Sequence, residues 1–208
     1  MTNPTRLLLV RHGQTELNRE SRFRGMSDIP LNERGRAEAL AVARLLEDQA
    51  VGTVYTSPVP RSVETAELIA RATGSDVIPD DGLIDIDYGG WQGLTVAEAE
   101  REFGAAMMEN WMRDTGRFEF PGGDRMADVR ARVAPALLEI AGENAGGTVA
   151  AVTHMAVLKV CFLVTMGLGF EWFWKVGIDN GSVSLFTHDE VSGFVLQFWN
   201  STPPLEGA

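Results

Sequence analysis

Short runs of consecutive apolar residues alternate along this chain with longer segments of helical periodicity. The runs at 6–10, 52–57 and 147–154 are typical of strands that are buried on both faces of a parallel sheet. Between and after them, apolar residues recur every three or four positions, which predicts helices over 31–50, 61–74, 121–142 and 156–167. This alternation predicts an α/β fold, a three-layer sandwich with a mostly parallel central sheet and helices on both faces.

Two later features modify the alternation. The segments 182–189 and 193–200 each alternate apolar and polar residues across a short turn, which predicts an antiparallel pair at the edge of the sheet. Pro135 lies inside the helix expected over 121–142 and predicts a kink or a break there. A length of 208 residues suits one domain with a full core, so we expect a single domain over 1–208.

Composition limits the classes of partner. A formal net charge of −11 argues against nucleic acid or an anionic membrane. The best membrane-span candidate, 160–170, is shorter than the roughly 18 to 20 apolar residues that a spanning helix needs, and the N-terminus lacks the pattern of a secretion signal. The only cysteine, Cys161, lies in an apolar run, which excludes an internal disulfide and fits a small buried side chain. We therefore expect a cytoplasmic protein.

The charge is distributed unevenly. Residues 1–36 carry seven arginines and four acidic residues, a balance of 7 − 4 = +3, so the rest of the chain carries −11 − 3 = −14. The planar guanidinium group suits bidentate binding of an oxyanion. Genome composition explains the preference for arginine over lysine in the whole chain, but the local cluster around His12 suggests an oxyanion site.

Two histidines follow two of the predicted strands. His12 comes after 6–10 and His154 ends the run 147–154, and ligands of open α/β sheets bind beyond the carboxyl ends of the strands. Arg61, which follows 52–57, belongs on the same rim. Arginines there would hold a phosphoryl group and keep His12 neutral, so that its ring nitrogen could attack phosphorus. One alternative is that these residues are only structural caps. Another is a metal site, but no carboxylate or cysteine lies at the close spacing of the usual zinc motifs.

Five blocks of the sequence decide between these alternatives. They are L-V-R-H-G-Q-T-E-L-N at 9–18, R-F-R-G-M-S-D-I-P-L-N-E-R-G at 22–35, S-P-V-P-R-S-V-E-T-A at 57–66, P-G-G-D at 121–124 and V-T-H at 152–154. In this order they resemble the histidine phosphatase superfamily, in its phosphoglycerate-mutase-like branch, over nearly the whole chain.

The resemblance implies a role for each matching position. His12 would accept the phosphoryl group as a phosphohistidine, and the residues that bind the phosphoryl oxygens would be Arg11, Asn18, Arg61 and His154. Arg24 and Gly25 match the loop that contacts the rest of the substrate. The segment of approximately 91–121 would form a small helical cap over the site. No metal or organic cofactor is implied.

The sequence departs from the family pattern at two positions. In G-L-I-D-I-D-Y-G-G-W-Q-G the position of the family's acid–base glutamate is taken by Asp85, which is one methylene shorter. Asp87 competes for this role because both would face the same way on an extended segment, and a third reading is that both only cap the turn at 89–90. Met155 stands where the family usually has glycine, so we expect the substrate to differ in shape from the substrates of other members.

The spacing within the cap region favours one activity. Mutases of the superfamily carry a longer insertion there, whereas Trp91 and Pro121 are only 121 − 91 = 30 positions apart. We therefore expect a metal-independent phosphatase that acts on a small phosphorylated metabolite, whose identity the sequence leaves open. The alternatives are a phosphoglycerate mutase and a phospholigand-binding protein without turnover. The aromatic run 170–174 fits either a homodimer surface or the core.

Overall fold

The computed structural model describes residues 3–205 and has one six-stranded sheet at its centre, with the strand order β3-β2-β4-β1-β5-β6. Strands β1 to β4 are parallel to one another. At one edge, β5 runs antiparallel to β1, and β6 runs antiparallel to β5. The strands are β1 (Thr5–Arg11), β2 (Val51–Thr56), β3 (Asp76–Pro79), β4 (Thr148–Thr153), β5 (Val183–Asp189) and β6 (Gly193–Ser201). The predicted parallel sheet and its antiparallel edge pair are both confirmed.

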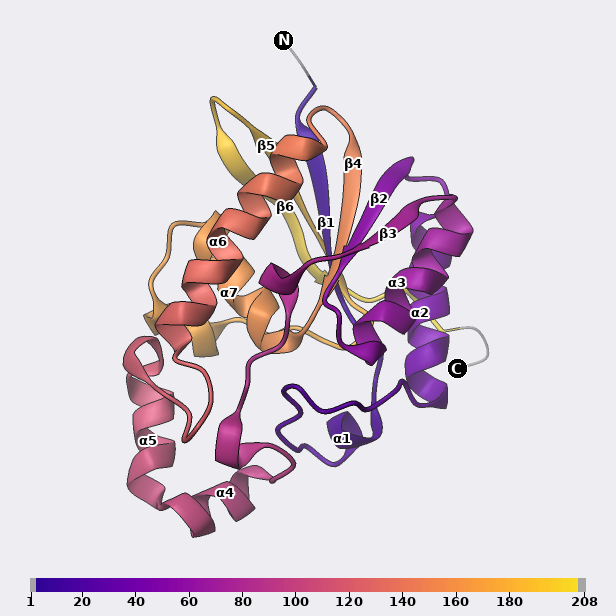
Figure 1. The fold of residues 1–208 in the computed structure, drawn as a ribbon. Coiled ribbons are helices and arrows are strands. Elements are labelled where there is room, and N and C mark those ends of the chain that lie inside the picture. Colours follow the sequence, from indigo (N-terminus) through magenta and orange to yellow (C-terminus); the bar gives the residue numbers. More distant parts are fainter. Residues whose placement is uncertain (1–2, 206–208) are drawn as a thin grey trace.

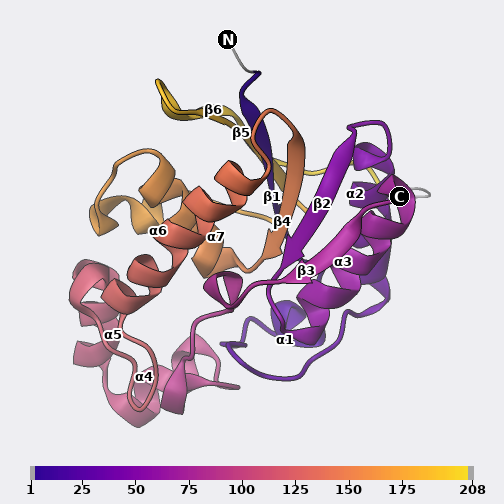
Figure 2. The same ribbon diagram turned by 45° about the horizontal axis from the view of Figure 1, so that its top comes forward.

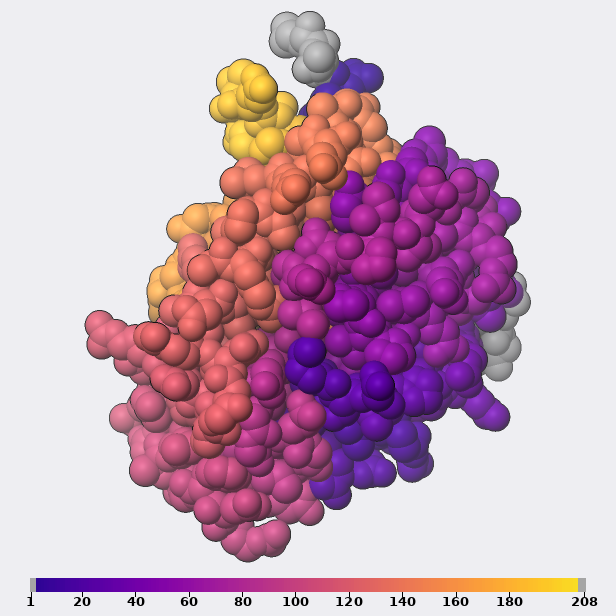
Figure 3. All heavy atoms as spheres, viewed as in Figure 1, coloured from indigo at the N-terminus to yellow at the C-terminus, as the bar shows by residue number. Residues whose placement is uncertain are grey.

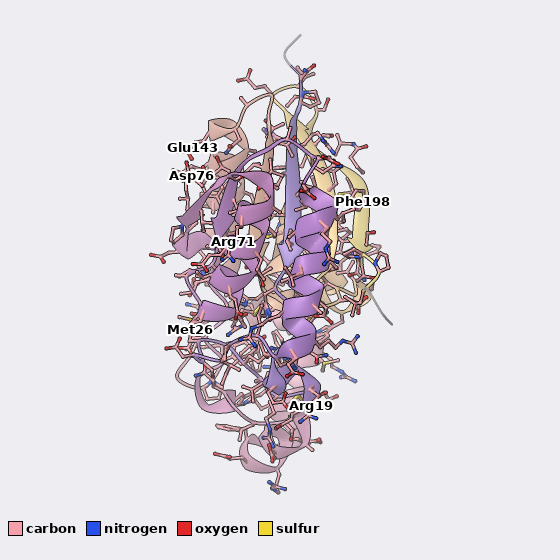
Figure 4. The ribbon with its side chains drawn as sticks, turned by 90° about the vertical axis from the view of Figure 1, so that its right-hand side faces the viewer. Arg19, Met26, Arg71, Asp76, Glu143 and Phe198 are labelled. Atoms are coloured by element: carbon pink, nitrogen blue, oxygen red, sulfur yellow. The ribbon has the colours of Figure 1, made fainter. Side chains whose placement is uncertain are left out.

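Helices cover both faces of the sheet (Figures 1 and 2). One face packs against α2 (Glu33–Leu46) and α3 (Pro60–Thr73), which Figure 4 shows on the side toward the viewer. The other packs against α6 (Met126–Glu143) and α7 (Met155–Thr165). This arrangement is the predicted three-layer sandwich. No helix within residues 3–205 is long and apolar enough to cross a membrane.

Strand β1 explains why its sequence is a continuous apolar run. Leu7 and Leu9 belong to the core on the α6 and α7 side, while Leu8 and Val10 belong to the core on the α2 and α3 side. All four are at most 2% exposed. Since successive side chains of a strand point to opposite faces, a sheet covered on both faces needs apolar residues at every position. Each such side chain contributes roughly 1.5–3 kcal/mol through burial.

Helix α2 begins at a local sequence signal, whereas α6 continues through one. Asn32 caps α2 by accepting a hydrogen bond from the Gly35 N–H at 2.8 Å, as predicted. Helix α6 runs unbroken through Pro135, so of the predicted kink or break the break does not occur. Pro135 is exposed, and the carbonyl that it leaves without a helical donor belongs to exposed Ala131, where water can replace the bond.

A small helical cap lies beyond the carboxyl ends of the parallel strands, at the lower end of the molecule in Figure 1. It contains α4 (Val96–Phe103) and α5 (Ala105–Arg113). Arg22 donates to the Glu98 carboxylate at 2.6 Å, which joins the cap to the loop after β1. In Figure 3 the pink cap segment lies directly against the indigo N-terminal segment. The cap therefore closes over the strand ends where the candidate residues lie.

The remaining elements are short helical segments of one or two turns. They are α1 (Glu16–Arg19), η1 (Asp81–Leu83), η2 (Gly89–Trp91), η3 (Thr115–Arg117) and η4 (Phe170–Lys175). Of these, η4 divides the aromatic run 170–174 between two environments: Phe173 is 1% exposed and packs in the core, whereas Trp172 and Trp174 are each 40% exposed. The run is therefore neither wholly core nor wholly surface.

Candidate active site

The two histidines lie side by side because their strands are neighbours. β1 pairs with β4 in parallel register, with Arg11 opposite Thr153, and the next residue on each strand is a histidine. The ring centroids of His12 and His154 are 5.1 Å apart. Both side chains are 1% exposed. The structure thus brings together the pair that the sequence placed at two separate strand ends.

Hydrogen bonds determine which nitrogen of His12 is free to react. Nδ1 lies 2.6 Å from the carbonyl oxygen of Gly13, so Nδ1 carries the proton and Nε2 holds the lone pair. Arg61 Nε donates to this Nε2 at 3.3 Å. Burial lowers the pKa of His12 well below its ordinary value, and the charges of Arg61 and Arg11 lower it further. The ring is therefore neutral, with its lone pair directed at the arginine cluster.

Two glycines set the position of the His12 loop. A Cβ atom on Gly13 would overlap the backbone of Gly35, and one on Gly35 would overlap the backbone of Gln14. The loop after β1 therefore packs directly on the first turn of α2. This contact explains why glycine follows His12.

Arg61 is the centre of the cluster and is completely buried. Its guanidinium group donates to Asp85 Oδ2 at 2.7 Å and to the Gly25 carbonyl at 2.7 Å. It also lies 3.1 Å from His154 Nδ1. Burial lowers the pKa of Arg61, while the nearby Asp85 carboxylate opposes that shift. One planar cation thus contacts both histidines and the carboxylate.

The structure separates the two candidate aspartates. Asp85 is 4% exposed, and its Oδ2 lies 3.5 Å from His154 Nδ1 in addition to its bond with Arg61. Asp87 instead accepts a hydrogen bond from the Gly89 N–H at 2.9 Å and caps that turn. Only Asp85 belongs to the cluster. The turn-capping alternative describes Asp87 and does not describe Asp85.

His154 is held from its other side by a residue that sequence reasoning did not single out. Its Nε2 lies 2.7 Å from Ser57 Oγ. Burial lowers the pKa of His154 well below its ordinary value, and the charge of Arg61 adds to this effect. Ser57 begins the S-P-V-P-R block, so its position in that block was the available signal.

The other predicted binding residues surround the cluster. Arg11 donates to the Ile178 carbonyl at 2.6 Å, and burial followed by repulsion from Arg24 lowers its pKa to about 9. Within the described chain, the Nε atoms of Arg11 and Arg24 have no hydrogen-bond partner. Asn18 accepts from the Thr15 N–H at 2.9 Å through Oδ1. Gly25 has a φ of 50°, and its carbonyl accepts a hydrogen bond from Arg61.

A cavity of about 640 Å³ adjoins this cluster. Its polar end is lined by Arg11, Asn18 and Arg24, together with Asn180, which also donates to the His12 carbonyl at 3.1 Å. His12, Arg61 and Asp85 do not line it and lie deeper. Met155 lines the cavity, in agreement with the expectation that it fills space a glycine would leave open. Asn180 comes from the loop before β5, and no motif marked it.

The model of the histidine phosphatase superfamily (branch 1) matches residues 7–202. This chain belongs to that superfamily. Phosphoserine phosphatase 1 of Hydrogenobacter thermophilus is 32% identical over 192 residues, which cover 92% of this chain and 90% of that protein. A 2,3-bisphosphoglycerate-dependent phosphoglycerate mutase of Gloeobacter violaceus is 32% identical over 188 residues, which cover 88% of this chain and 85% of the mutase.

Solved structures agree with this membership. The structure of a mycobacterial glucosyl-3-phosphoglycerate phosphatase with VO3 matches this histidine phosphatase with a TM-score of 0.85 and 28% identity, over 95% of this chain and 99% of that one. Other matched relatives, from Mycobacterium tuberculosis and Mycobacterium bovis, are longer, and this chain spans 50% of their length. The relatives thus include phosphatases with different named substrates and a mutase.

Proposed function

We propose that this histidine phosphatase hydrolyses a small phosphomonoester through a phosphohistidine on His12. The observation that carries the proposal is the unprotonated Nε2 of His12, which accepts a hydrogen bond from Arg61 Nε at 3.3 Å. Neutral imidazole is the nucleophilic form, and a cation beside it attracts the phosphoryl oxygens. The same charges that would bind phosphate therefore keep His12 ready to attack.

In the first step, Nε2 of His12 attacks phosphorus in line with the ester oxygen. The N–P bond forms as the P–O bond to the alcohol breaks, and protonated Asp85 gives its proton to the departing oxygen. In the second step, Asp85 takes a proton from water as the water oxygen attacks phosphorus. The N–P bond then breaks, and inorganic phosphate and neutral His12 are released.

The arginines and the second histidine stabilise charge in both steps. Arg11 and Arg61 hold the oxygens of the transferred group, as do Asn18 and His154, and the pre-formed hydrogen bonds of Arg61 keep it in position without reorganisation. These cations supply the neutralisation that metal ions supply in other phosphoryl-transfer enzymes, so we propose that turnover is independent of metal. A cytoplasmic location and a homodimer stay predictions from the sequence.

Two alternatives have specific support. The relative named as a phosphoglycerate mutase supports mutase activity, which the short cap segment disfavours. The bond between Asp85 and Arg61 supports a phospholigand-binding protein, because a carboxylate engaged by a buried guanidinium must exchange this partner to reach a leaving group. The phosphatase proposal accounts for both the cluster and the short cap.

The test is phosphate release from a panel of phosphomonoesters in the presence of a chelator, with 3-phosphoglycerate products analysed for isomerisation. We expect release by the wild type, loss of at least about 1,000-fold in His12→Ala, and full activity in the control His188→Ala, whose ring packs on Phe194 away from the site. Release that is unchanged in His12→Ala would refute the proposal. Isomerisation without release would favour the mutase.

A further inference from the structure

The cavity beside the His12 cluster is where the organic part of a bound ester would lie. Arg11, Asn18 and Arg24 line its polar end, and Arg11 directly precedes His12. A phosphoryl group held at His12 therefore has its ester oxygen directed toward this space. The character of the remaining wall then determines which alcohols fit.

Five aromatic residues contribute to that wall. Phe23 and Tyr88 line it from the loops near the cluster, with ring centroids 5.1 Å apart. Trp111 of α5 and Trp174 of η4 line it from the cap side, with centroids 5.3 Å apart. Phe173 lies beside Trp111. Rings at these separations form a packed apolar surface on which a further flat ring can stack.

The charge of the residues that line the cavity also favours a neutral aromatic ring. Arg11, Arg22 and Arg24 line the cavity, and no acidic side chain of residues 3–205 does so. An alcohol that carries an ammonium group would be repelled by these cations and would find no carboxylate partner among the residues that line the cavity. A neutral ring would meet neither penalty.

The size of the cavity and its methionines agree with a ring. A volume of about 640 Å³ exceeds what a two-carbon or three-carbon alcohol fills. Met108, Met112 and Met155 complete the wall. Flexible thioether side chains can adapt to a ring and make favourable contacts with its edge.

Resting on the function proposed above, we infer that the substrate is a phosphomonoester whose alcohol carries an uncharged aromatic ring. This class differs from the amino-acid ester that gives the Hydrogenobacter thermophilus relative its name. The phosphate is held by the arginine cluster, and the ring is held between Tyr88 and Trp174.

The test compares three esters of primary alcohols, so that the leaving groups are similar: 2-phenylethyl phosphate, ethyl phosphate and phosphoethanolamine. We expect kcat/KM to be about ten-fold or more higher for 2-phenylethyl phosphate than for ethyl phosphate, and lowest for phosphoethanolamine. Equal rates for the first two, or a preference for phosphoethanolamine, would overturn the inference. Hydrolysis of ethyl phosphate would still support the phosphatase function.

Two tryptophans of η4 provide a matched pair of variants. Trp174 and Trp172 are both 40% exposed, but only Trp174 lines the cavity. We expect Trp174→Ala to lower the preference for the phenyl ester several-fold and Trp172→Ala to leave it unchanged. An equal effect of the two substitutions would contradict the assignment of the ring site.

A binding measurement covers the case in which no ester is hydrolysed. The non-hydrolysable probe is 2-phenylethylphosphonate, compared with ethylphosphonate by calorimetry. Tighter binding of the phenyl compound, lost in Trp174→Ala, would support the ring site even without turnover. Equal binding of the two phosphonates would overturn it.

Discussion

The cluster around His12 and the cavity wall beside it consist of different kinds of side chain. The cluster consists of charged and polar groups at the ends of strands and helices of the sandwich, joined by short hydrogen bonds such as the one between Arg61 and Asp85 at 2.7 Å. The wall includes rings from the loops near the cluster, from the cap and from η4, which pack on one another, and Trp174 is 40% exposed. A directional network fixes geometry, whereas apolar packing tolerates substitution. This difference places the chemistry in the cluster and substrate choice in the wall.

The largest expected effect concerns Asp85. Loss of the general acid should lower kcat/KM, which reports phosphoryl transfer to His12, in Asp85→Asn by about 100- to 10,000-fold for alkyl phosphates. The loss in kcat/KM should be much smaller for p-nitrophenyl phosphate, whose leaving group needs no proton. The measurement is kcat/KM for both esters, with Asp87→Asn as the matched control on the same segment. An equal loss for both esters would contradict the acid role.

Arg61 should be the largest single contributor to the stability of the cluster. Arg61→Met leaves the buried Asp85 carboxylate without its partner, so we expect a loss of about 3–5 kcal/mol in the free energy of unfolding. Denaturant titration measures this. The control is Arg36→Met, whose partner Glu64 is 30% exposed, so that the loss should be below about 1 kcal/mol. Similar losses in both variants would mean that the buried pair of Arg61 and Asp85 contributes no more to stability than the more exposed pair of Arg36 and Glu64.

The neutral histidines make stability depend on pH in a definite direction. In the folded chain the pKa values of His12 and His154 are lowered by burial and by Arg61. Below pH of about 6.5 the unfolded chain binds protons that the folded chain does not, so stability is full above that pH and falls as the pH drops. The slope should be about 1.4 kcal/mol per pH unit for each histidine.

Denaturant titrations at pH 6.5, 6.0 and 5.5 measure this slope, before most carboxylates titrate. His154→Gln removes one of the two groups and should reduce the slope by about half. A slope that is unchanged in this variant would show that His154 is not kept neutral by the fold.

The smallest expected effect on stability concerns Lys159, which packs behind the cavity wall. Lys159 is 7% exposed, with Nζ 5.0 Å from the ring centroids of Phe173 and Trp174. Burial, followed by repulsion from Arg11, lowers its pKa to about 8. Because the buried charge costs more than the ring contacts return, we expect Lys159→Met to stabilise the fold by about 1 kcal/mol at pH 7.

The pH dependence of this gain tests its cause. Between pH 8 and about 10.5 the unfolded chain holds a proton that folded Lys159 has lost, so the stability of the wild type rises with pH in this window. The advantage of Lys159→Met should therefore shrink toward pH 10.5. An advantage that is constant with pH would indicate a packing effect instead.

Most of the sandwich could be predicted because its signals are local. The apolar run at 6–10 predicts a buried strand at its own position, and Asn32 predicts the start of the helix that it caps. The positions of His12 and His154 followed from the rule that strand ends meet at one edge of a sheet. The sequence left a kink or a break open at Pro135, because the cost of the proline depends on whether the freed carbonyl reaches water, which the sequence does not reveal.

The rest depended on approaches between distant segments. Asp85 and Asp87 lie on an irregular segment, where alternation does not decide which side chain turns inward. Asn180 reaches the His12 carbonyl from a loop 168 residues further along the chain. Trp174 and Tyr88 line the same cavity although they are 174 − 88 = 86 positions apart in the sequence. None of these contacts has a local sequence signal.

The most direct test of the central claim is to trap the phosphoenzyme. Asp85→Asn should accumulate it with p-nitrophenyl phosphate, because this ester needs no acid for the first step while hydrolysis of the intermediate still needs a base. After a quench in alkali, mass spectrometry of peptides should find one phosphoryl group on His12, and none in the double variant with His12→Ala. A phosphoryl group on another residue, or none at all during turnover, would contradict the account.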